Sequence, residues 1–169
     1  MNDDTIEITV LGAIKRGCKK FNKIKNMTKL PSTDINSALE RLEKNHMIRV
    51  EEKSGWLGKK IEITTTRRGD DELDVKIQVM EQNWSKMATA YESGNKKDVR
   101  QFMDSNRSIL PTMLFFGIID MVMFSMMFSM IGSTMTDYIP TESIPDGYGG
   151  DGIDDGGMDD SRFDFDIGF

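Results

Sequence analysis

The sequence has few of the cysteine and histidine side chains on which many catalytic and metal sites depend. Its 169 residues include one cysteine, Cys18, and one histidine, His46. A single cysteine excludes an internal disulfide and a multi-cysteine metal site, and a single histidine excludes a histidine cluster. The sequence has no P-loop, nucleophile elbow or zinc-binding spacing. We therefore expect no enzymatic activity, no cofactor and no metal.

The N-terminus also lacks the basic stretch and apolar core of a signal peptide. We therefore expect the N-terminal domain to stay in the cytoplasm.

Charge is present but unevenly distributed along the chain. The net charge is −6, which alone argues against a nucleic-acid partner. Residues 1–70 carry 15 Lys and Arg against 10 Asp and Glu, a net charge of +5. Residues 71–110 have a net charge of −1, and residues 111–169 carry 1 basic against 11 acidic side chains, a net charge of −10. Binding to a polyanion is therefore expected only from the first 70 residues.

Hydrophobic spacing predicts three helices and a hairpin in the basic part of the chain. Helical periodicity covers 3–16 and 20–29, and Ser32 or Thr33 is a suitable N-cap for a third helix that ends near His46. Alternating β-branched residues predict strands at 48–52 and 61–66, joined by a tip of five to seven residues. Helix, helix, helix, two-stranded hairpin, helix is the element order of a winged helix-turn-helix, an α+β fold.

The rest of the chain divides into three segments. Periodic apolar residues predict a helical extension over 71–107, followed by an apolar, Met-rich helix within 109–135. The acidic, Gly- and Asp-rich segment 136–169 lacks the apolar residues for a core, so we expect a disordered tail. This tail either keeps the protein soluble, mimics DNA and competes for the basic domain, or binds a protein partner through its phenylalanines, which are Phe163, Phe165 and Phe169.

Four short motifs support the same fold. They are FNKI at 21–24, STDINSALERLEKN at 32–45, MI at 47–48 and TRRG at 66–69. With their order and spacing, the chain over residues 4–92 resembles the MarR/PadR-type winged helix-turn-helix transcriptional regulators of archaea and bacteria. The resemblance implies DNA binding and dimerisation through helices that flank the winged helix. One departure is His46, which stands where the family has glycine in a left-handed conformation that histidine tolerates at some cost.

The third predicted helix fits the DNA major groove, with short polar side chains near its N-terminus. Basic residues of the hairpin and of the following helix could clamp phosphates, as could Lys19, Lys20, Lys23 and Lys25. The predicted DNA contacts are Ser32, Thr33, Asn36, Ser37, Arg41, Lys44, Lys59, Lys60, Arg67 and Arg68. The same elements also contain acidic residues, including Glu40 and Glu43. A second interpretation therefore stays open, in which the protein is an adaptor that uses the winged helix to bind another protein.

The segment 109–131 has 23 residues and one charged side chain, Asp120. As a single helix it would be about 34 Å long, enough to cross a bilayer. A charge at the midpoint disfavours insertion. Three interpretations remain open at this point: a membrane anchor that tethers a cytoplasmic domain, a homodimer interface, or a Met-rich groove for hydrophobic client proteins.

Overall fold

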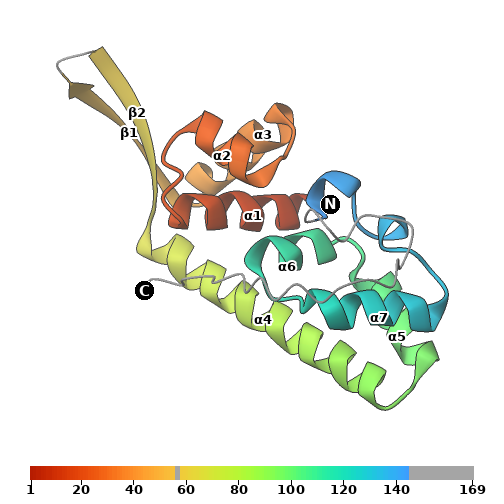
Figure 1. Ribbon diagram of the computed structural model, residues 1–169. Helices are drawn as coiled ribbons and strands as arrows, with labels where there is room; N and C mark the ends of the chain where they lie inside the picture. The colour runs from red at the N-terminus through yellow and green to blue at the C-terminus, as the bar shows by residue number, and fades with distance from the viewer. Residues whose placement is uncertain (56–57, 145–169) are drawn as a thin grey trace, which may run out of the picture.

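The protein is a helix-rich α+β molecule with one small sheet (Figure 1). The computed structural model describes residues 1–55 and 58–144, except for the side chains of 53–55 and 58–60. In this part of the chain there are seven α-helices and a two-stranded antiparallel sheet. The elements are α1 (Asp3–Lys15), α2 (Phe21–Thr28), α3 (Ser32–Lys44), β1 (Ile48–Gly55), β2 (Gly58–Thr65), α4 (Arg67–Glu92), α5 (Lys96–Asn106), α6 (Leu110–Phe116) and α7 (Met121–Ile131), followed by the short 3-10 turns η1 (Met135–Asp137) and η2 (Thr141–Ser143).

Helix α1 lies at the centre of the fold. It contacts α2, α3, α4, α6 and β2, and Figure 1 shows it between the α2–α3 pair and the layer that contains α4 and α6. From Thr5 to Ile14, Glu7 is the one residue that is not buried. A helix that is enclosed on all sides needs no polar face, and this explains the nearly continuous apolar sequence of α1.

Helices α2 and α3 cover one side of α1, and the hairpin projects from the same end of the molecule (Figure 1). Ile24 of α2 and Ile35 and Leu42 of α3 are completely buried. The strands pair in register from Ile48 opposite Thr65 to the glycines that face each other at the far end. The prediction of a tip of five to seven residues is therefore wrong, because strand pairing continues to these glycines. The tip residue Trp56 lies outside the described residues.

Helix α4 begins at Arg67, four residues before the predicted start of the helical extension at 71. The reason is Thr66, whose side chain accepts a hydrogen bond from the backbone N–H of Gly69 at 3.1 Å and so caps the first turn. The helix continues for 26 residues and ends at Glu92, and α5 packs against it. The predicted helical extension over 71–107 thus comprises most of α4 together with α5.

The apolar segment forms two short helices, so the prediction of a single helix within 109–135 is wrong. Gly117 ends α6 in the left-handed conformation, with φ of 72°, which glycine adopts at low cost. Asp120 then caps α7 by accepting a hydrogen bond from the N–H of Met123 at 2.8 Å. The carboxylate therefore lies at an exposed helix start and not in the middle of a span. None of the helices that the structure describes has the length and apolar character needed to cross a bilayer.

These two helices supply the core of the C-terminal layer. Phe124 makes edge-on ring contacts with Trp84 of α4, at 6.1 Å between centroids, and with Phe128, at 4.7 Å. Helix α6 is joined to α1 by a buried hydrogen bond between the hydroxyls of Thr9 and Thr112, at 3.1 Å. The apolar segment is thus packed within the molecule.

Residues 136–144 also pack onto this layer, which contradicts the expectation that the disordered tail begins at 136. The Tyr138 hydroxyl donates to Asp104 at 2.7 Å, and Arg107 donates to the backbone oxygen of Asp137. Ile139 and Ile144 are buried. Residues 145–169 lie outside the described part of the chain.

Candidate nucleic-acid interface

The exposed side of α3 presents a row of polar residues opposite its buried stripe. The helix buries Ile35, Ala38 and Leu42 against the rest of the N-terminal unit. Residues at helical spacing on the other side are exposed, and we call them the polar face of α3. They are Thr33, Asn36, Ser37, Glu40 and Lys44. The predicted contacts Thr33, Asn36, Ser37 and Lys44 therefore share one accessible surface, with one carboxylate among them.

The start of α3 differs from the expected cap. Pro31 occupies the N-cap position, and Ser32 is the first helical residue and half-buried. No side chain caps this helix start, because proline has no hydrogen-bonding side chain. The Thr33 hydroxyl instead lies 3.3 Å from a carboxylate oxygen of Asp34. Uncapped N–H groups at a helix start attract anions. The negative charge of Asp34 in the same turn repels anions and so weakens this attraction.

Arg41 is not on the polar face. Its Nε donates a hydrogen bond to a carboxylate oxygen of Glu7 on α1, and its Nη1 lies 3.7 Å from Asp3. The hydrogen bond with Glu7 raises the pKa of the Arg41 guanidinium above its usual value. The predicted DNA contact through Arg41 is therefore replaced by an ion pair between α1 and α3. The reason is its position beside the buried stripe, next to Leu42 and one turn after Ala38.

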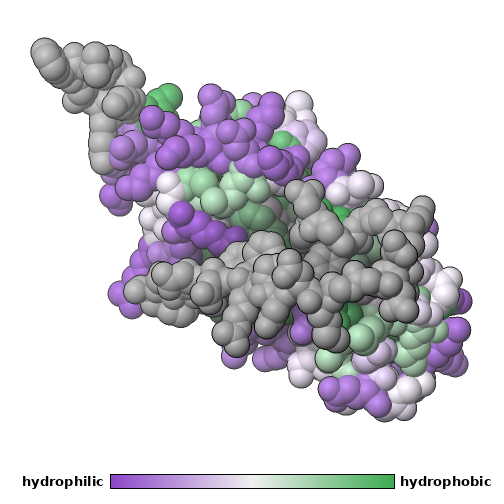
Figure 2. Space-filling view, in the orientation of Figure 1, coloured by the Kyte–Doolittle hydropathy of each residue, from purple (hydrophilic) through white to green (hydrophobic). Residues whose placement is uncertain are grey.

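Five lysines on and beside α2 form the densest group of exposed positive charge near α3. Residues 17–33 contain no acidic residue, and the lysines in this segment are all exposed. None of them makes an ion pair with another residue that the structure describes. We call them the α2 lysines: Lys19, Lys20, Lys23, Lys25 and Lys29. Figure 2 shows hydrophilic surface over α2 and α3 along one edge of the molecule.

Sequence reasoning missed Lys29. It terminates α2 in the left-handed conformation, with φ of 57°, and its backbone N–H donates to the carbonyl of Lys25 at 2.9 Å. Residues 17–33 contain no acidic residue, and this signal could have added Lys29 to the lysines predicted to bind phosphates.

The hairpin is fixed to the α1–α2 connection. The N–H of Ile63 on β2 donates to the carbonyl of Lys19 at 3.0 Å, and the Ile63 side chain is buried. The predicted contacts Lys59 and Lys60 lie on β2, opposite Ser54 and Lys53 respectively. Their side chains are outside the described part of the protein, so their direction stays a prediction.

The TRRG motif forms the junction between the hairpin and α4. The Thr66 hydroxyl donates to the carbonyl of His46 at 2.7 Å, and the Thr66 N–H donates to the carbonyl of Met47 at 2.9 Å. A Cβ on Gly69 would lie 2.1 Å from the Met47 carbonyl oxygen, so this close approach requires glycine. The junction holds Arg67 and Arg68 exposed in the first turn of α4.

His46 adopts the left-handed conformation expected from the position of glycine in the resembling family, with φ of 58°, and its side chain is exposed. It follows the C-cap Asn45 at the end of α3. Its backbone conformation turns the chain from α3 into β1. We assign it a structural role at this turn.

The geometry therefore brings together two kinds of surface, a polar helix face and the α2 lysines, beside a projecting hairpin. No protein-family model matches the sequence, and neither curated proteins nor solved structures provide a match.

Proposed function

We propose that the protein binds double-stranded DNA through its N-terminal unit and regulates transcription, with residues 1–70 acting as a winged helix. The observation that carries the proposal is the group of exposed α2 lysines, which have no ion-pair partner among the described residues and lie on and beside the helix that packs against α3. A duplex concentrates negative charge along its backbone, and unpaired lysines gain by replacing its condensed counterions. This function places the protein in the cytoplasm, where archaeal and bacterial DNA lies.

In this proposal α3 enters the major groove with its polar face toward the bases. Thr33, Asn36 and Ser37 are short enough to reach base edges, and the amide of Asn36 can bond to adenine through two hydrogen bonds. The basic residues contact phosphates on either side and set the position of α3 in the groove. These phosphate-binding residues are the α2 lysines, Lys44, Lys59, Lys60, Arg67 and Arg68.

The test is a titration of the full chain with a fluorescent duplex at several salt concentrations. Affinity should fall steeply with salt, and a variant with Lys23→Ala and Lys25→Ala should bind more weakly at low salt. Each phosphate contact that is lost should flatten the slope of log affinity against log salt by about 0.9. The matched control is Lys96→Ala with Lys97→Ala, which removes two exposed charges at the start of α5. Equal effects of the two double variants, or no salt-dependent binding, would contradict the proposal.

Sequence specificity has a separate test. Once a preferred duplex has been selected from a random pool, Asn36→Ala should weaken binding to it by about 1–3 kcal/mol. Binding to an unrelated duplex should not change, because that binding depends on phosphate contacts. Equal losses of affinity for both duplexes would show that Asn36 does not contact the bases.

A second candidate is a protein-interaction adaptor, and one observation favours it. Val122 and Met126, one turn apart on α7, are 55% and 51% exposed. Such a surface suits a second copy of the chain or another apolar partner. Light scattering of the full chain tests the homodimer, and Met126→Asp should convert a dimer to a monomer. A dimer that persists in this variant would place the interface elsewhere.

A further inference from the structure

The C-terminal segment carries charge that complements the α2 lysines. Residues 145–169 contain eight aspartates and one arginine. The α2 lysines are the largest local group of exposed cations in the described part of the chain that have no acidic partner. We propose that residues 145–169 bind the α2 lysines of the same molecule and compete with DNA for them. The competition rests on the proposed function, whereas the contact between the two segments does not.

Three other cations on or against α1 are already engaged. Lys15 pairs with Asp74 at 2.7 Å, and Lys76 pairs with Asp4 at 3.2 Å, so that these residues join α1 to α4. Arg16 donates to the Phe115 carbonyl at 3.0 Å. An anionic segment that approaches this end of the molecule therefore meets its unneutralised charge on the α2 lysines.

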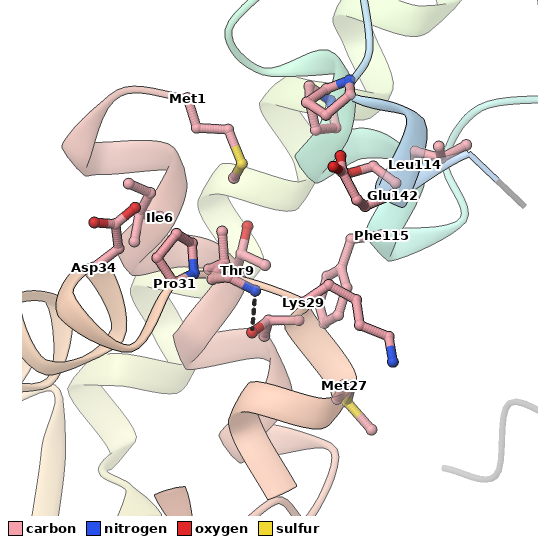
Figure 3. Close-up of a pocket in the computed structure, with 15 residues that line it drawn as sticks. Met1, Ile6, Thr9, Met27, Lys29, Pro31, Asp34, Leu114, Phe115 and Glu142 are labelled. Atoms are coloured by element: carbon pink, nitrogen blue, oxygen red, sulfur yellow. Dashed lines mark hydrogen bonds between the residues drawn. The ribbon is translucent and has the colours of Figure 1, made fainter. Parts of the chain in front are cut away.

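The described chain ends after a turn that shares a cavity with the end of α2. Turn η2 packs against α6, and Ile144 is buried. A cavity of about 520 Å³ lies between this turn and the end of α2. Glu142 from η2 and Met27 and Lys29 from the end of α2 line the same cavity, as Figure 3 shows. The last turn of the described chain and the end of α2 therefore line the same cavity.

The length of the segment is more than sufficient. Twenty-five residues can span up to about 80 Å, whereas the eight residues of α2 make a helix about 12 Å long. A tethered segment that can span its site acts at an effective concentration in the millimolar range. Weak ion pairs between aspartates and lysines are therefore enough to occupy the site, and salt should weaken this contact as it weakens DNA binding.

The contact itself can be tested without DNA. A zero-length carbodiimide reagent joins carboxylates to lysine amines, and mass spectrometry of the cross-linked monomer of the full chain locates the products. We expect aspartates of 145–169 to be joined to the α2 lysines at low salt, and much less to Lys96 and Lys97, which are equally exposed on α5. Products distributed equally over the two groups of lysines would overturn the contact.

The competition is tested with a full-length variant in which each aspartate of 145–169 is replaced by asparagine. This variant should bind duplex about tenfold more tightly than the natural chain at low salt, and the difference should shrink as salt is added. Equal affinities of the two chains would overturn the competition. If neither chain binds DNA while the cross-links to the α2 lysines form, the proposed function is wrong and the contact stands.

Discussion

Helix α7 has no charged residue, and the stretch of α1 from Thr5 to Ile14 has one, Glu7, but the two lie in different surroundings. Helix α1 is in contact with four helices and a strand, and its residues from Thr5 to Ile14 are buried apart from Glu7. Helix α7 packs on α5 and touches α4 through the rings of Phe124 and Trp84. Its opposite side is exposed and contains Val122, Ser125, Met126 and Ser129.

The difference shows that an apolar helix is not by itself a membrane span or a fully enclosed core helix. In α1 every direction is covered, so each apolar side chain is removed from water. In α7 only the Phe124 side is covered within the molecule, and on the other side Val122 and Met126 are exposed beside Ser125 and Ser129. The first two predictions below test how fully each helix is enclosed, and the last two test the start and the exposed side of α7.

The largest effects are expected at the centres of the two buried surfaces. Leu11 of α1 and Phe124 of α7 are both 0% exposed. Leu11→Ala and Phe124→Ala should each lower the free energy of unfolding by about 3–5 kcal/mol, because each leaves a cavity. Urea denaturation of each variant measures this change. A loss below about 1 kcal/mol for Phe124→Ala would mean that α7 is not part of the core.

The contact between α1 and α6 depends on the small size of Gly12. A Cβ at this position would lie 2.4 Å from the ring of Phe116, so Gly12→Ala should destabilise the protein by about 1–3 kcal/mol. In the Phe116→Ala background the same substitution should stabilise it by about 0.5–1 kcal/mol, because alanine favours a helix more than glycine does. A double-mutant cycle by urea denaturation measures both values. Destabilisation in both backgrounds would place the cause outside this contact.

A smaller effect is expected at the start of α7. Asp120→Ala removes the carboxylate that accepts a hydrogen bond from the Met123 N–H and should cost about 1 kcal/mol. Asp120→Asn keeps an acceptor and should be close to neutral. Thermal unfolding of both variants makes the comparison, and equal losses would show that the negative charge, not the hydrogen bond, is the source of the stability.

The smallest effect is expected on the exposed side of α7. Val122→Ser and Met126→Ser alter side chains that are more than half exposed, so the unfolding free energy should change by no more than about 0.5 kcal/mol. Urea denaturation at low protein concentration measures this value. A loss of several kcal/mol that grows with protein concentration would show that this side is buried in an oligomer.

The elements with a strong pattern could be predicted from the sequence. Helices α3 and α4 have regular apolar spacing. Helix α3 lies within two residues of its predicted bounds, and α4 begins four residues before the predicted extension. The left-handed conformation of His46 was also expected, and it is observed. Spacing was informative here because each helix is buried on one side only.

The apolar segment could not be divided correctly from hydrophobicity alone. In a run where nearly every residue is apolar, periodicity does not mark the helix ends. The break depends on Gly117 and Asp120, whose capping roles were outweighed by the overall apolar composition. The placement of Arg41 was missed for a different reason, since its partner Glu7 is 34 positions away in the chain. Contacts of this kind depend on tertiary packing and are not contained in local patterns.

Helix α4 connects the hairpin to the C-terminal layer as one continuous helix. Its 26 residues make a rod about 39 Å long, and its first turn is fixed to the end of the hairpin through Thr66 and Gly69. Its other end carries Trp84 against Phe124, within the α5–α7 layer (Figure 1). A rotation of about 3° of such a rod at the hairpin would displace its far end by about 2 Å. A change in the position of β1 and β2 would therefore reach the contact of Trp84 with Phe124 along a single helix.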